Sequence, residues 1–162
     1  MAVAPLLGKD TYLYINTGTL AGDGSGTWTE ITLAKDATLD QSKDEIDITN
    51  RESARAGYKA TAQGQKGFKI DFDTHIAALG ETPNAGTALL EAAFYDDSQI
   101  EVVIAYGNIN TGTAIPATFA VCTVGGGNEG HPLNDAVTRS VSLTNVGAPI
   151  RGAYTTSTFT PS

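Results

Sequence analysis

The feature that most constrains the fold is the segment 68–75, in which apolar and polar side chains alternate strictly from Phe68 to Asp73. The apolar members are Phe68, Ile70 and Phe72, and the polar members between them are Lys69, Asp71 and Asp73. Successive side chains of a β-strand point to opposite faces, so this pattern predicts a strand with one buried and one wet face. The rest of the chain must therefore cover one side of a β-sheet.

Several other segments have the composition of strands, with β-branched or aromatic residues bounded by turn residues. They are residues 12–15, 28–32, 37–41, 45–49, 100–106, 117–124 and 137–144. The nearly continuous apolar run 100–106 is typical of a central strand. Residues 12–15 and 28–32 flank a glycine-rich loop, which predicts a hairpin. We therefore expect a mainly β fold in a single domain that spans residues 1–162.

One helix is predicted, at residues 82–95. Thr82 can cap its start, and Pro83 can occupy its first helical position. Its apolar stripe consists of Ala85, Leu89, Ala92 and Ala93, flanked by Leu90 and Phe94. An amphipathic helix of this kind buries its apolar side, so we expect it to cover one side of the β core.

Residues 50–67 form a long segment with three glycines and few large apolar side chains. Loops of this length are uncommon in compact domains and usually have a function of their own. We interpret the segment as an exposed arm between two strands. Its charged and aromatic members are Arg51, Glu52, Arg55, Tyr58, Lys59 and Lys66. At the ends of the chain, residues 1–9 are expected to form an N-terminal arm, and residues 145–162 either a last strand or an arm.

The charge balance excludes several classes of function. The chain has 10 Lys and Arg against 18 Asp and Glu, a net charge of −8, and its basic residues are scattered. Tight nucleic-acid binding needs a basic stripe, which is missing, although an acidic protein can let DNA slide past. A membrane span needs about 18 apolar residues in a row, and residues 1–9 lack the apolar core of a signal peptide. We therefore expect no membrane anchor.

Two patterns could carry ligand chemistry. Residues 125–130 match G-x-G-x-x-G, but Pro132 and a strand pattern follow in place of the helix that would hold a pyrophosphate. Asp71, Asp73 and His75 share one strand face and could hold a metal ion, although the nearby Lys69 would repel it. The favoured interpretations are a plain turn and a solvated polar face.

No residue stands out as catalytic. Cys122 lies in an apolar run, which predicts a small buried side chain, and His131 lies in a turn expected at the surface. Paired carboxylates need a cleft that separates their pKa values, and nothing indicates one around the acidic residues. These residues are Asp36, Asp40, Asp44, Glu45 and Asp47. We expect no enzyme, no cofactor and no metal.

Short stretches of the sequence resemble phage major tail tube proteins, whose superfamily includes the tubes of bacterial injection machines. The stretches are WTEI at 28–31, DATL at 36–39, EIDITNR at 45–51 and GFKIDF at 67–72, with Gly57 and Tyr58 between the last two. The predicted helix and the apolar strand at 102–106 follow in the family's order. The resemblance covers residues 10–145 and rests on the order of these elements.

The resemblance implies a β-sandwich or partly closed β-barrel with one flanking helix and a long extended arm. Copies would form hexameric rings that stack into the tail tube, through which DNA passes during ejection without specific binding. Residues 50–67 would reach a neighbouring subunit, the terminal segments would help to lock stacked rings, and Lys69, Asp71 and Asp73 are candidates for the channel face. The implied partners are further copies, a tail terminator, a baseplate or initiator and a tape-measure protein. The implied location is the virion tail, assembled in the host bacterial cytoplasm.

The alternative is a β-sandwich binding module of a carbohydrate-binding or adhesin type. Such a module predicts a monomer with a row of exposed aromatic side chains. Aromatic residues make up 7% of the chain, and Trp28, its one tryptophan, stands beside Thr and Ile in a predicted strand. Trp28 therefore suits a core or an interface, and the tube interpretation is favoured.

Overall fold

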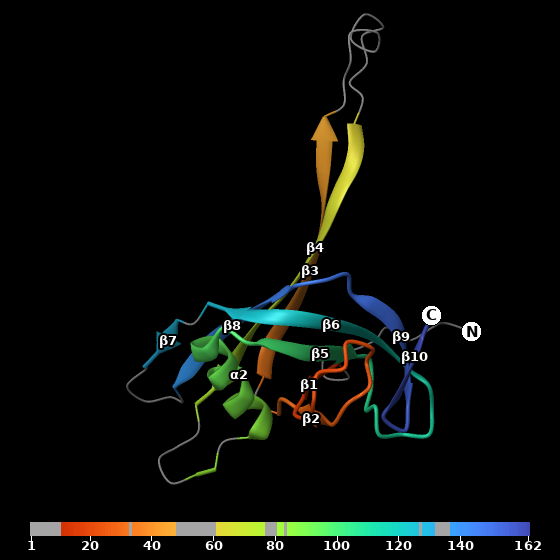
Figure 1. The fold of residues 1–162 in the computed structure, drawn as a ribbon. Coiled ribbons are helices and arrows are strands. Elements are labelled where there is room, and N and C mark those ends of the chain that lie inside the picture. The colour runs from red at the N-terminus through yellow and green to blue at the C-terminus, as the bar shows by residue number, and fades with distance from the viewer. Residues whose placement is uncertain are drawn as a thin grey trace, which may run out of the picture.

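Antiparallel strands make up most of the computed structural model (Figure 1). The structure describes residues 11–32, 34–47, 61–76, 81–82, 84–126, 128–131 and 137–162. The strands are β1 (Tyr12–Asn16), β2 (Trp28–Glu30), β3 (Ala34–Asp47), β4 (Thr61–His75), β5 (Gln99–Ala105), β6 (Ile115–Gly125), β7 (Glu129–Gly130), β8 (Thr138–Asn145), β9 (Ile150–Thr155) and β10 (Thr158–Pro161). With one helix, α2 (Ala85–Asp96), they confirm the expected mainly β class.

The strands form one 10-stranded sheet in the order β2-β1-β5-β6-β8-β4-β3. Strand β6 divides this sheet, because one of its sides pairs with β5 and the other with two strands. Residues 122–125 of β6 pair with β8, and residues 115–119 pair with β9, which in turn pairs with β10. The outer strands β2 and β3 both contribute residues to one cleft of about 500 Å³, so the sheet curls toward itself.

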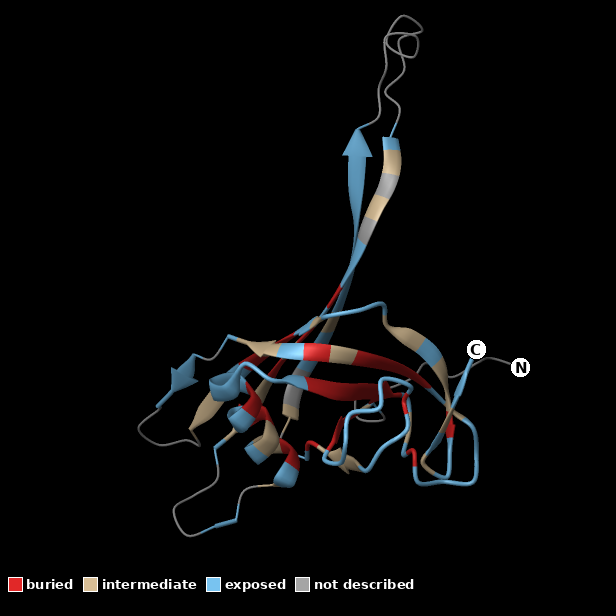
Figure 2. Cartoon of the chain, in the orientation of Figure 1, coloured by how far each residue is buried: buried red, intermediate tan, exposed pale blue. Residues whose placement is uncertain are grey.

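The alternation predicted for residues 68–75 is confirmed in β4. Phe68, Ile70 and Phe72 are buried, and they join a core cluster that includes Leu13 and Ile15 of β1. Residues 100–105 of β5 are all buried, which confirms the predicted central strand. Figure 2 shows buried residues concentrated in β5, β6 and the inner side of the helix.

Helix α2 covers this first core cluster, but its start and its buried stripe differ from the prediction. The side chain of Asn84, not that of Thr82, caps the helix by accepting a hydrogen bond from the N–H of Gly86. Gly86, Leu90 and Ala93 are the buried residues, whereas Ala85 and Ala92 are exposed. Gly86 allows close packing, because a Cβ there would lie 2.8 Å from Cγ2 of Ile15.

A second core cluster lies on the opposite face of β1, β5 and β6. It contains Tyr14, Val103, Phe119 and Tyr154, whereas Leu13 and Ile15 belong to the first cluster. Successive side chains of β1 thus pack into the two clusters in turn, because they point to opposite faces of the strand. The hairpin β9–β10 covers the second cluster, so residues 150–161 form strands, one of the two alternatives expected for the C-terminal segment.

Strands β3 and β4 are longer than their sequence patterns indicate, and together they project from the body (Figure 1). Residues 61–67, which the sequence analysis assigns to the arm, belong to β4 and pair with β3 down to the pair Asp47 and Thr61. Residues 1–9 and 50–60 lie outside the described part of the chain.

Candidate assembly surfaces

The projecting pair of strands, here called the ribbon, consists of residues 40–47 of β3 and 61–69 of β4. Every residue from Asp40 to Asp47 is exposed, as the pale blue colour in Figure 2 shows. A two-stranded ribbon without a third strand or a covering layer is marginally stable in water. The ribbon therefore offers a surface that contact with another chain would stabilise.

Local geometry shapes the ribbon. Its pairing register shifts between Lys43 and Glu45, which marks a bulge. Near it, Gly64 lets the strands approach, because a Cβ there would lie 3.1 Å from Cβ of Asp44. Ile46 is 52% exposed in this charged segment, and a large apolar side chain in such a setting is a candidate contact residue.

The structure describes one of the six arm residues expected from the sequence. Arg51, Glu52, Arg55, Tyr58 and Lys59 lie outside the described residues. Lys66 is exposed on β4, opposite Lys43 in the register.

The acidic residues expected at a wet surface lie mostly on the ribbon. Asp40, Asp44, Glu45 and Asp47 are exposed on β3. The side chain of Asp36 lies outside the described part. On the ribbon these carboxylates form an acidic surface along one strand.

The polar face of β4 meets a hydroxyl-rich strand. Asp71 lies opposite Ser142 of β8, and Asp73 lies opposite Ser140, whose Oγ donates a hydrogen bond to Oδ1 of Asp73 at 2.6 Å. Nζ of Lys69 lies 2.9 Å from Oδ2 of Asp71. Hydrogen bonds from Lys69 and Ser142 lower the pKa of Asp71, which keeps it ionised. The structure thus brings Lys69, Asp71 and Asp73 together on one polar sheet face.

The alternatives for ligand chemistry gain no support. Among the described residues, Asp71, Asp73 and His75 form no group that could hold a metal ion. The glycine-rich segment leads from β6 into β7, whose residues 129–130 pair with β8, and no helix follows in the described part. His131 lies 3.5 Å from Glu129 and is exposed, as expected.

Cys122 is buried in the first core cluster, as the sequence predicts. Burial raises the pKa of its thiol to about 12. A thiol with such a pKa is almost entirely protonated at neutral pH and is a poor nucleophile.

Trp28 is half-buried and packs against the second core cluster. Its ring meets those of Phe119 and Tyr154 edge to face, with centroids 6.2 and 5.9 Å apart. Such packing engages the half-buried indole with core rings, which disfavours its use in a binding row of the kind that a carbohydrate-binding module presents.

Sequence reasoning missed a buried polar cluster around Glu101 of β5. Glu101 and Asn16 are 0% and 1% exposed, and Nδ2 of Asn16 donates to Oε2 of Glu101 at 2.6 Å. The N–H of Gly22 donates to the other carboxylate oxygen. The available signal was that Glu101 is the one charged residue in the apolar run 100–106.

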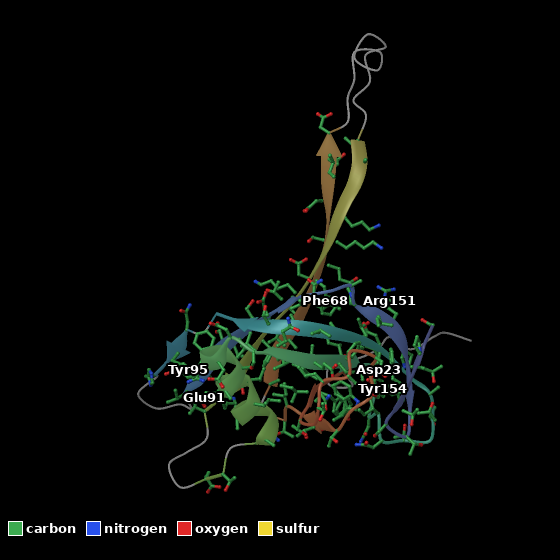
Figure 3. All side chains as sticks on the ribbon, in the orientation of Figure 1. Asp23, Phe68, Glu91, Tyr95, Arg151 and Tyr154 are labelled. Atoms are coloured by element: carbon green, nitrogen blue, oxygen red, sulfur yellow. The ribbon has the colours of Figure 1, made fainter. Side chains whose placement is uncertain are left out.

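A second missed cluster joins α2 to the end of β8. The guanidinium of Arg139 bonds Oε1 of Glu129 and lies 3.6 Å from Oε1 of Glu91. Arg139 also lowers the pKa of Glu129. Figure 3 shows Glu91 and Tyr95 projecting from the same end of the helix. These ion pairs tie the helix to the sheet edge beside β7.

No helix in the described part of the chain is both long and apolar enough to cross a membrane.

Solved structures of tail and tube chains share the fold of this chain. The SPP1 tail tube matches with a TM-score of 0.66 and 15% identity over 94% of this chain and 82% of that chain. A chain from the tail of an empty gene transfer agent particle, refined with C6 symmetry, matches with a TM-score of 0.65 and 15% identity over 95% and 98%.

A contractile injection system provides a third match. A chain of the PVC sheath–tube complex in the extended state has a TM-score of 0.60 and 14% identity, over 92% of each chain. No protein-family model and no curated protein sequence matches the chain. The expected resemblance to tail tube proteins is confirmed at the level of the fold.

Proposed function

We propose that this chain is the structural subunit of a tail tube and performs no catalytic step. The observation that carries the proposal is the match to tail and tube chains over more than nine tenths of its length. A shared fold alone does not define a function. The exposed ribbon and the polar face shared by β4 and β8 offer surfaces for contacts between copies and for a channel, so they support the same conclusion.

In this proposal six copies close into a ring, and rings stack into a tube. The C6 symmetry of the gene transfer agent tail motivates the number six. Strands β2 and β3 lie at the two ends of the strand order in the described part. Closure of a symmetric ring covers such edges, which otherwise promote aggregation.

The polar face of β4 and β8 would line the channel. Its carboxylates Asp71 and Asp73 and the hydroxyls of Ser140 and Ser142 present negative charge and small polar groups. Negative charge repels DNA phosphates, so DNA would pass through the channel during ejection without binding to it. Lys69 is held near Asp71 and leaves the face acidic on balance.

The arm predicted over residues 50–67, whose residues 61–67 belong to the ribbon, would reach a neighbouring subunit through Arg51, Glu52, Arg55, Tyr58, Lys59 and Lys66. Residues 1–9 would help to lock stacked rings. The tube would meet a tail terminator, a baseplate or initiator and a tape-measure protein. Its place would be the virion tail, after assembly in the host bacterial cytoplasm.

Negative-stain electron microscopy of the purified chain, with its mass in solution, tests the proposal. Hollow rings or stacked tubes with six-fold symmetry are the expected result. A monomer at every protein and salt concentration, together with glycan binding in a screen, would instead support the binding-module alternative.

A further inference from the structure

Three segments form what we call the uncharged surface: residues 17–27, 107–114 and 152–162. Of these 30 residues only Asp23 has a side chain that is charged at neutral pH, whereas 17% of the whole chain is charged. Most of the loop residues are exposed, including all of 17–23 and 110–114. The chain therefore has an extended exposed area that is almost free of charge.

Hydrogen bonds join the three segments into one unit. The N–H groups of Thr156 and Ser157 donate to the carbonyls of Thr111 and Ile109 at 2.8 and 2.9 Å. The hydroxyl of Tyr154 donates to the carbonyl of Gly24 at 2.8 Å, and Figure 3 shows Asp23 close to Tyr154. The C-terminal hairpin is thus bonded to both loops.

Part of the uncharged surface has an unfavourable backbone conformation. Thr156 and Ser157, at the tip of the β9–β10 hairpin, have φ values of 48° and 61°. Positive φ is unfavourable for side chains with a Cβ, above all for β-branched threonine. Such a conformation persists only where its surroundings hold it, and here the bonds to residues 109 and 111 do so.

Buried polar side chains hydrogen-bond the backbone of the loop 17–27. Oδ1 of Asn16 accepts hydrogen bonds from the N–H groups of Gly18 and Thr27 at 2.9 and 3.0 Å. Glu101 accepts the N–H of Gly22, and neither Asn16 nor Glu101 is exposed by more than 1%. An exposed loop is therefore ordered in advance by side chains that have no contact with solvent.

A surface with one charged side chain among 30 residues suits contact between two molecules that repel each other. Each copy carries a net charge of −8, so two copies repel, and contact is least opposed where neither presents charge. Prior ordering lowers the entropy cost of association. Leu20, which is 47% exposed in the loop 17–27, adds apolar area for burial.

We propose that a second copy of this chain docks on the uncharged surface in the assembled tube. The inference rests on the proposed function and adds the place of contact. Charge distinguishes this surface from the exposed side of α2, which carries Glu91 and Asp96 besides Ala88.

The test is the protein concentration at half-assembly, measured by sedimentation and electron microscopy. The variants Leu20→Glu and Thr113→Glu each add one charge to an exposed position of the surface. Leu20→Gln and Thr113→Gln change the same positions without charge, and Ala88→Glu adds the same charge on α2. The unfolding midpoint of each variant verifies that it folds. Because two positions are tested, the experiment remains informative if the variant at one of them misfolds.

We expect both Glu variants to need at least about tenfold more protein for half-assembly, since an unpaired like charge in an interface is strongly unfavourable. The Gln variants and Ala88→Glu should stay within about twofold of the wild type. Normal assembly of both Glu variants, or loss of assembly in Ala88→Glu alone, would overturn this inference and leave the proposed function intact. A wild type that never assembles would overturn both.

Discussion

The carboxylate of Glu101 lies 2.6 Å from Nδ2 of Asn16, and both side chains are fully enclosed by the protein. Glu101 lies in the central strand β5, and Asn16 ends β1 where the loop 17–27 begins. Through Gly22, the same carboxylate also bonds the far side of that loop. One buried acidic residue thus fixes the shape of an exposed loop.

Replacing Glu101 should release this loop. Glu101→Ala removes one of the two acceptors of the Asn16 amide, whose Nδ2 also donates to the carbonyl of Thr19, and an unsatisfied buried donor costs about 1–3 kcal/mol. We expect the free energy of unfolding in urea to fall by about 2–4 kcal/mol in total, since a cavity is also created. Amide exchange in residues 17–27 should accelerate. The control is Asp23→Asn, at an exposed site in the same loop, and an equal loss of stability there would contradict this account.

Glycine is required at position 26 for a steric reason. A Cβ on Gly26 would lie 2.5 Å from Nδ2 of Asn16, whereas a Cβ on Gly112 would meet nothing within 4 Å. Gly26→Ala should lower the free energy of unfolding by about 2 kcal/mol or more, because Asn16 is buried and cannot yield. Gly112→Ala, the matched control, should stay within about 0.5 kcal/mol of the wild type. Thermal unfolding of the two variants provides the comparison, and similar midpoints would refute the proposed clash.

Alkaline pH should destabilise the fold through Cys122. Burial raises the pKa of this thiol from 9.0 to about 12, so the folded chain keeps a proton that the unfolded chain loses above pH 9. Because the unfolded state then binds fewer protons, stability falls as pH rises from 9 toward 12.

By pH 11 this effect amounts to about 3 kcal/mol, and burial of Tyr154, whose pKa is also raised, adds to it. Urea denaturation at a series of pH values measures it. Cys122→Ala should reduce the slope above pH 9, whatever its effect on stability at pH 7. An unchanged slope would mean that other groups cause the alkaline loss.

The arm can be removed without removing the ribbon. Asp47 and Thr61 are paired across the ribbon, so residues 48–60 can be replaced by Asn-Gly, a pair that favours a two-residue hairpin turn. We expect a folded chain with unchanged circular dichroism that forms no tubes, because the arm's contacts are lost. Tubes of normal length in electron micrographs would show that assembly does not depend on the arm.

Reversing the charge of the proposed channel face should make tubes retain DNA. Asp71→Lys with Asp73→Lys places cations where acidic groups stand, and cations attract phosphates in a salt-dependent manner. Assembled tubes of this variant should protect a short duplex from nuclease at low salt and release it at high salt. The control, Asp71→Asn with Asp73→Asn, should bind far less. Bound DNA that nuclease still digests would place this face on the outside of the tube.

The elements that sequence patterns located best are those with a strong local period. The alternation in residues 68–75 and the apolar run 100–106 correspond to β4 and β5, and both have the predicted burial. The helix was found, but its cap was assigned to Thr82 instead of Asn84 and its buried stripe was rotated. Alanines occur on several sides of this helix, so the sequence pattern did not identify which side is buried.

The sequence by itself determined the mainly β class, the single helix, the burial of Cys122 and the low density of charge, because each follows from local composition and period. Only the tertiary structure decided which groups Glu101 binds and which segments lie together in the uncharged surface. Glu101, Asn16 and Gly22 meet because β5 pairs with β1, and residues 109–111 meet 156–157 because β6 pairs with β9. Contacts between residues far apart in the chain depend on strand order and register, which no local pattern specifies.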